Sequence, residues 1–209
     1  RITEINAAPH AANLVSSMQE PAVDRTLFQF LEVANLGDEP IDLAGVELRD
    51  IQLGFVNEGV TFRFAEQTIS PGEHRVIVSN VDAFIERYGN GVDLANGNDG
   101  ADGPVGQFGG NLEVGGETLT LIDADGVTIH QFDYGRVLNT IPRAAGRGSS
   151  LEVVDPTQKY GDTGNWQSSS DYGGNPGMAT SFEKDELVIN EVFADGNNTS
   201  SWIEIHNVT

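Results

Sequence analysis

The chain has 209 residues, which is enough for one domain of ordinary size or one domain with part of a second. Its 32 acidic residues outnumber its 11 basic residues and give a formal net charge of −21, which repels nucleic-acid phosphates and anionic lipid headgroups. The absence of cysteine excludes thiolate metal sites and thiol nucleophiles, and no apolar run approaches the roughly 20 residues of a membrane-spanning helix.

Short apolar runs bounded by Gly, Pro, Asn or Asp follow one another along the chain, and each predicts a β-strand. The predicted strands are residues 2–6, 27–35, 46–49, 60–64, 74–79, 119–123, 127–132 and 150–153. A polar insert at residues 7–25 separates the first two strands. The Asp125-Gly126 pair predicts a tight hairpin turn in the second half of the chain.

One short helix is expected after the strand at residues 74–79. Ser79 or Asn80 can cap its N-terminus and Gly89 can end it, while one face carries Val81, Phe84, Ile85 and Tyr88. Many short strands with a single short helix predict an all-β, antiparallel β-sandwich.

Two sequence blocks near the start of the chain recur near its end in the same order. Residues 189–192 repeat the pattern of residues 2–5, and residues 202–208 repeat that of residues 30–36. Because two blocks recur together, chance is a weak explanation. The repeat predicts a second copy of the opening hairpin.

The repeat divides the chain into three expected parts. Residues 1–180 form the sandwich, residues 181–186 a linker, and residues 187–209 the opening hairpin of a second unit. Two strands alone cannot bury a core, so we expect Thr209 to be a truncation point. We also expect the hairpin to favour self-association of the chain.

The order of several short motifs resembles the bacterial lamin-tail domain, an immunoglobulin-like β-sandwich, over about residues 1–180. The motifs are residues 2–5, residues 30–33 with Asn35, Pro40, Asp42, Leu43 and Gly45, residues 69–72, Tyr88-Gly89, residues 109–112, Gly116, Thr118, Leu119 and Leu121, Asp125-Gly126, Tyr134, residues 150–152, Asn165-Trp166, and residues 175–177. The resemblance implies an appended module of a large secreted or surface protein, often beside hydrolases, with no catalytic residues. The chain departs from the family pattern at residues 7–25 and 93–103.

Two carboxylates, Glu4 and Glu32, recur as Glu191 and Glu204 in the second hairpin. If the two opening strands pair, Glu4 and Glu32 come close, and such a pair needs a cation or a cationic side chain between its members. Candidates for that side chain are Arg25, Arg49 and Arg63. The alternative is that both carboxylates lie on a solvent-exposed strand face.

The loop at residues 93–102 is rich in side-chain oxygen atoms, which suggests a calcium site. The candidate ligands are Asp93, Asn96, Asn98, Asp99 and Asp102. The spacing does not match a helix–loop–helix calcium loop, so a solvated loop is the alternative.

Trp166 and Tyr172 stand in a polar stretch and are candidate contacts for a ligand or a partner. The alternative for Trp166 is that it anchors this irregular segment to the sandwich. The histidines lie at no metal-ligand spacing, and the residues form no catalytic constellation.

We therefore expect a non-catalytic, extracellular binding or scaffolding module. Its expected partners are proteins, glycans and neighbouring domains of the same chain, without nucleic acid or membrane insertion. The alternatives are an accessory domain that positions a linked hydrolase and a calcium-dependent adhesion module.

Overall fold

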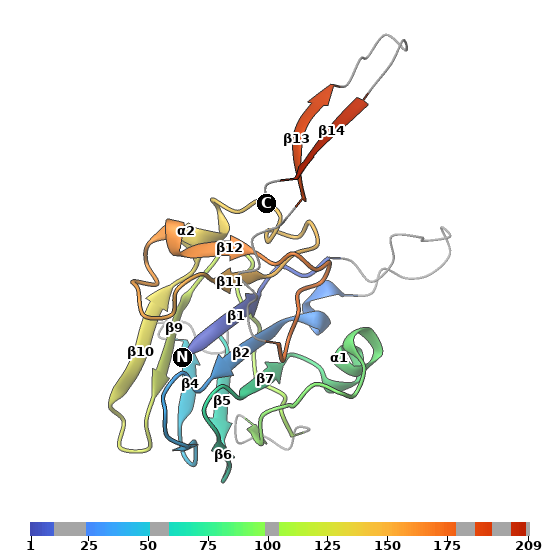
Figure 1. The fold of residues 1–209 in the computed structure, drawn as a ribbon. Coiled ribbons are helices and arrows are strands. Elements are labelled where there is room, and N and C mark those ends of the chain that lie inside the picture. The colour runs from blue at the N-terminus through green and yellow to red at the C-terminus, as the bar shows by residue number, and fades with distance from the viewer. Residues whose placement is uncertain (11–23, 51–58, 99–104, 179–186, 194–201, 208–209) are drawn as a thin grey trace.

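The computed structural model describes residues 1–10, 24–50, 59–98, 105–178, 187–193 and 202–207, and its main body is a β-sandwich (Figure 1). The strands of the first sheet are β1 (Ile2–Asn6), β2 (Phe30–Ala34), β7 (His74–Val78), β11 (Leu151–Val153) and β12 (Trp166–Ser168). Their order is β12-β11-β1-β2-β7, and each neighbouring pair is antiparallel.

A second antiparallel sheet faces the first. Its strands are β4 (Glu47–Asp50), β5 (Thr61–Phe64), β8 (Gly97–Asn98), β9 (Thr118–Ile122) and β10 (Thr128–Asp133). They are ordered β10-β9-β4-β5-β8. A small sheet pairs β3 (Ile41–Asp42) with β6 (Thr68–Ile69), and a separate hairpin pairs β13 (Leu187–Phe193) with β14 (Trp202–Asn207).

The helical elements are short. They are α1 (Val81–Tyr88), α2 (Gly135–Leu138) and the 3-10 helices η1 (Arg25–Phe28) and η2 (Thr163–Asn165). As predicted, α1 starts after Asn80, whose side chain accepts a hydrogen bond from the backbone N–H of Ala83, and it ends at Gly89. No helix in the described parts of the chain is long and apolar enough to cross a membrane.

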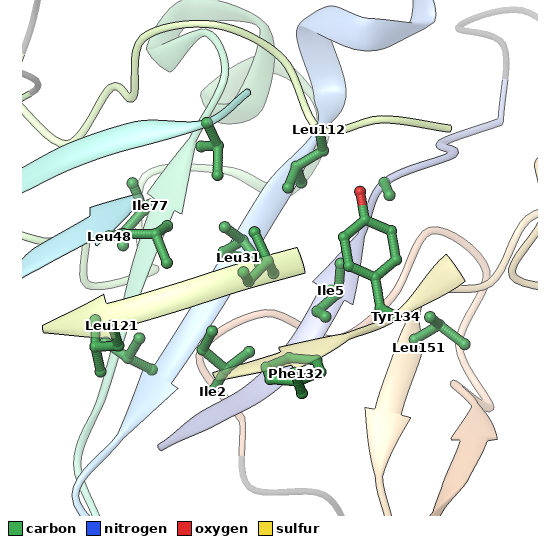
Figure 2. Close-up of a cluster of buried hydrophobic side chains, with 14 of the residues drawn as sticks. Ile2, Ile5, Leu31, Leu48, Ile77, Leu112, Leu121, Phe132, Tyr134 and Leu151 are labelled. Atoms are coloured by element: carbon green, nitrogen blue, oxygen red, sulfur yellow. The ribbon is translucent and has the colours of Figure 1, made fainter. Parts of the chain in front are cut away.

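The main core fills the space between the two sheets (Figure 2). Leu31 and Ile77 from the first sheet and Leu48 and Leu121 from the second are at most 5% exposed. Because side chains alternate between the two faces of a strand, every second residue of β2 points into this core. Burial of these faces is the main driving force for the sandwich.

The other face of the first sheet carries a smaller core beneath α1. Phe30, Val76, Val78 and Phe84 form it, and all four are at most 1% exposed. Phe30 and Phe84 meet edge to face, with ring centroids 6.0 Å apart. This outer face is thus covered as well, and β2 is buried on both sides.

Several predicted boundaries differ from the structure. The strand predicted at residues 27–35 begins at Phe30, because the Asp24 side chain caps η1 by accepting a hydrogen bond from the N–H of Thr26. The expectation of a single helix was wrong, since α2 and two 3-10 helices are also present. Helices of three or four residues are too short to carry a periodic apolar pattern. Most of the insert at residues 7–25, and the linker at residues 181–186, lie outside the described residues.

Candidate functional site

Three glutamates lie side by side on the outer face of the first sheet. Glu4 on β1 is directly opposite Glu152 on β11 and Glu32 on β2. Their exposed fractions are 2%, 3% and 1%. Glu4 and Glu32 therefore lie close together, as predicted. The alternative, that both lie on a solvent-exposed strand face, does not fit, because both are buried. We call these three residues the glutamate row.

A β-bulge in β1 places Glu4 on this face. Ile2 is opposite Val33 and Glu4 is opposite Glu32, so β1 holds one extra residue, Thr3, between the two pairs. The bulge lets Ile2 point into the main core while Thr3 and Glu4 both turn toward Glu32. A regular strand would have turned Ile2 and Glu4 to the same face.

Three polar groups lie within hydrogen-bond distance of the Glu32 carboxyl group. The Thr3 hydroxyl donates to Oε1 at 2.5 Å, and Nδ1 of His74 lies 2.8 Å from the same oxygen. The backbone N–H of Gly177 donates to Oε2 at 2.7 Å. None of the three candidate arginines is among these contacts. Arg49 and Arg63 both pair with Glu47 on the second sheet, and the Arg25 guanidinium lies beside Gly146.

Glu4, in the middle of the row, has a different set of hydrogen-bond partners. Its Oε1 accepts a hydrogen bond from the Ser150 hydroxyl and another, at 3.1 Å, from the backbone N–H of Asn175. Burial raises the pKa of the Glu4 carboxyl well above its ordinary value, the Ser150 hydrogen bond opposes this shift, and the neighbouring carboxylates reinforce it.

Glu152 is the least satisfied member of the row. Its Oε2 accepts from the Gln167 side chain at 3.1 Å, and its Oε1 has no hydrogen-bond partner within the described part of the chain. Burial raises the pKa of this carboxyl too, against the Gln167 hydrogen bond. A proton on one or more of these carboxyls would relieve the repulsion within the row.

A segment that follows β12 covers the row, and we call residues 169–178 the strap. Besides the Asn175 and Gly177 N–H groups, its Gly173 carbonyl accepts hydrogen bonds from the Asn6 side chain at 3.0 Å and from the Tyr88 hydroxyl at 2.7 Å. Burial raises the pKa of Tyr88 to about 12. The strap is therefore bonded to β1, to α1, to Glu4 and to Glu32.

Gly174 packs against Glu4 and Ser150. A Cβ atom at this position would lie 2.5 Å from Oε1 of Glu4 and 2.9 Å from the Ser150 hydroxyl oxygen. The backbone also has a φ of +94°, which L side chains rarely adopt. Glycine is thus required here for two separate reasons.

A cavity of about 580 Å³ opens beside the strap, between the start of β7 and the end of α1. His74, Tyr88 and Met178 are among the residues that line it. The His74 side chain is only 11% exposed. Since Nδ1 of His74 is held by Glu32, this imidazole joins the cavity to the glutamate row.

The sequence did not single out Ser150, Glu152, His74 or the strap as partners of Glu4 and Glu32. A weak signal is present for three of them, since residues 150–152 contain Ser150 and Glu152, residues 175–177 lie in the strap, and both segments are motifs of the resemblance. Motifs so far apart in the chain reveal no mutual contact until the fold is known.

Trp166 lies in the core rather than on a binding surface, with 5% of its surface exposed. Its indole N–H donates to the Tyr160 carbonyl at 2.8 Å, and its ring stacks on Phe132 with centroids 5.6 Å apart. This placement fits the anchoring alternative. Tyr172 is 52% exposed and contacts the His10 ring at 4.2 Å, so contact with a partner stays a prediction for Tyr172.

The predicted calcium loop is only partly described. Asp99 and Asp102 lie outside the described residues, as does the side chain of Asn98. The Asn96 side chain donates to the Glu66 carbonyl, and Asp93 faces Arg75 at 3.8 Å. Within the described ranges, no three His, Asp or Glu side chains are grouped so that they could hold a metal ion. Calcium binding by this loop remains a prediction.

The hairpin at the end of the chain repeats the pairing of β1 with β2, including the bulge. In the first sheet the pairs are Ile2–Val33, Glu4–Glu32, Ile5–Leu31 and Asn6–Phe30. In the hairpin they are Ile189–Ile205, Glu191–Glu204, Val192–Ile203 and Phe193–Trp202, with the register shift again before the glutamate.

Replacing Glu4 with glutamine should make the melting temperature, relative to that of the wild type, rise as the pH increases above about 4.3. The raised pKa of Glu4 means that the folded protein keeps a proton that the unfolded chain releases. This proton stabilises the fold fully below the pKa of the unfolded chain, about 4.3, and its contribution is lost as pH rises through the folded pKa.

The groups that face Glu4 are the Glu32 and Glu152 carboxyls, the Ser150 hydroxyl and the Tyr88 phenol. None of them is changed in the Glu4→Gln variant, which removes only the titration of Glu4. Thermal melts of both proteins across this pH range measure the difference. A melting-temperature difference that does not vary with pH would contradict the assignment.

One family model matches the chain. It is described as Lamin Tail Domain and covers residues 1–136. No curated protein and no solved structure is similar enough to count as a match. β11, β12 and the strap lie beyond the matched residues, yet β11 pairs with β1, so the folded unit extends past residue 136.

Proposed function

Because this chain belongs to the lamin tail domain family, we propose that it is a binding and scaffolding module of a larger secreted or cell-surface protein. The lamin tail domain is a non-catalytic domain. The proposed role is therefore carried by surfaces and by connections to neighbouring units rather than by a reaction.

The observation that carries the proposal is the hairpin β13–β14. It repeats the strand pairing and the bulge of β1–β2, residue for residue, beyond the end of the sandwich. Figure 1 shows it extending away from the two sheets. A sandwich followed by the opening pattern of another is the arrangement of a tandem array, in which each unit acts as a spacer or an attachment point.

The glutamate row supports a structural role for its carboxyls. Glu4 and Glu32 are held by backbone N–H groups of the strap and by the hydroxyls of Thr3 in β1 and of Ser150, the residue before β11. Catalytic acid pairs in glycoside hydrolysis instead flank a bound substrate in an open site. Here the strap occupies the face to which both carboxyls point.

The charge of the chain supports the proposed class of partner. A net charge of −21 favours cationic or neutral partners, such as basic protein surfaces and glycans, and opposes binding to nucleic acid. The location outside the cell is part of the proposal and follows from the kind of protein in which the resembling domains occur.

Deleting residues 185–209 is expected to change the melting temperature of the sandwich by less than about 2 °C, because a module of an array folds independently of its neighbour. A matched deletion of residues 169–209, which also removes the strap, should lower the melting temperature strongly, since it uncovers Glu4 and Glu32. Calorimetry of the three chains measures both effects. If the shorter deletion unfolds the sandwich, the hairpin belongs to the first domain and the scaffold proposal fails.

A further inference from the structure

We propose that the β13–β14 hairpin is an interaction surface for the remaining strands of a second lamin-tail sandwich, in which it takes the place that β1–β2 holds in the first. The inference rests on the proposed function and makes it specific, because it names what the hairpin binds. The partner is a set of strands equivalent to β3 through β12, with the apolar inner face of their second sheet left uncovered.

The two faces of the hairpin correspond to the two faces of β1–β2. The shared register and bulge place Ile189, Val192, Ile203 and Ile205 where Ile2, Ile5, Leu31 and Val33 stand in the first sheet. Those four residues of the first sheet point into the main core and are at most 4% exposed. The hairpin therefore has one face whose counterpart is entirely buried.

In the hairpin this same face is open. Val192, Ile203 and Ile205 are 60%, 61% and 64% exposed. Burying one such side chain stabilises a fold by roughly 1.5–3 kcal/mol. A two-stranded hairpin is at best marginally stable alone, so this face needs a covering surface.

The first sandwich shows which surface covers such a face. Leu31 and Ile5 pack in one core with Leu48 of β4 and Leu121 of β9 (Figure 2). β11 pairs with the outer edge of β1, and β7 pairs with the outer edge of β2. The same complement of strands would cover both the open face and the open edges of the hairpin.

The first sandwich cannot itself supply this surface. Leu48 is 1% exposed and Leu121 is 5% exposed, because β1–β2 already covers them. The partner must therefore be a second set of strands that lacks its own opening hairpin.

The outer face of the hairpin indicates that the partner also includes a helix and a strap. Trp202 stands where Phe30 stands, and it is 43% exposed whereas Phe30 is buried under α1. It stacks on Phe193 with ring centroids 5.9 Å apart. Next to this pair, Glu191 lies opposite Glu204, as Glu4 lies opposite Glu32 beneath the strap.

The test extends the full chain with the proposed partner. Asn207 corresponds to Asn35 in the repeat, so a second copy of residues 38–178 is appended directly after Thr209. We expect the appended strands to fold on the β13–β14 hairpin. The calorimetric unfolding enthalpy per mole of chain should then rise about twofold over that of the unextended chain, because this enthalpy scales with the number of folded residues.

Three control chains make the result decisive. Two copies of residues 1–178 in tandem, each with its own β1–β2, define the signal of two folded units. The extended chain with Ile203→Asp and Ile205→Asp should lose the second unit. The same chain with Ile85→Asp, at a residue of α1 that is 40% exposed, should keep it.

If the tandem control shows two units while the extended chain shows only one, the inference is overturned. The same holds if the two aspartates in β14 leave the second unit intact. Either result would leave the scaffold proposal standing, since that proposal depends on the deletion of residues 185–209.

Discussion

Replacing Glu32 with alanine is expected to lower the free energy of unfolding by about 3–5 kcal/mol, because it removes the shared partner of three buried polar groups. The variant leaves the Thr3 hydroxyl, the His74 ring and the Gly177 N–H without their acceptor. Each buried donor that loses its partner costs about 1–3 kcal/mol. The cost is large because the Glu32 side chain is only 1% exposed.

Two further variants separate this effect from a loss of charge. Glu32→Gln keeps one carbonyl acceptor and should cost less than alanine. Glu86→Ala, at an exposed position on α1, removes a charge without a buried bond and should change stability by less than about 0.5 kcal/mol. Chemical denaturation at neutral pH measures all three. Equal losses for Glu32→Ala and Glu86→Ala would mean that the strap does not depend on Glu32.

Replacing Gly174 with alanine should cost about 2–5 kcal/mol, the sum of backbone strain and overpacking. The new methyl group would lie 2.5 Å from Oε1 of Glu4 and 3.1 Å from the ring of Phe30. Both are buried, so neither can move aside without disturbing the sheet. We expect the strap to lift from Glu4 and the Asn175 hydrogen bond to be lost.

Gly72→Ala is the matched control for this prediction. Gly72 has a φ of +77°, close to the +94° of Gly174, but no atom lies within 4 Å of the position of its Cβ. It carries the backbone strain alone, which should cost about 1–2 kcal/mol. Urea unfolding of both variants gives the difference, and limited proteolysis at residues 169–178 detects a lifted strap. Equal losses of unfolding free energy in the two variants would show that the close contact between Gly174 and Glu4 does not add to the cost of a side chain at residue 174.

The alternation of apolar residues was sufficient to predict most of the sandwich strands. β1 lies where the sequence predicts it, and β7, β9, β10 and β11 differ from the prediction by one residue at one or both ends. The capped amphipathic pattern at residues 80–89 similarly located α1. These signals are local, because strand and helix periodicity act between residues that are close in the chain.

The short strands β3, β6, β8 and β12 were not predicted. Gly97–Asn98 looked like part of an oxygen-rich loop, yet it pairs with β5. Two or three residues carry too little pattern to identify a strand, and their pairing depends on an edge that a distant segment provides. Trp166 was ambiguous for a related reason, since nothing close to it in sequence shows that Phe132 and Tyr160 surround it.

The sequence by itself determined the lamin-tail family and the antiparallel sandwich, and it predicted a second opening hairpin, because each depends on the order and spacing of residue types. Only the tertiary structure decided the role of the glutamates. Glu4 and Glu32 become neighbours of Glu152, His74 and the strap through contacts that span from 28 to 171 residues of chain. Whether a carboxylate is solvated or buried depends on which distant segment covers it, and no local pattern contains that information.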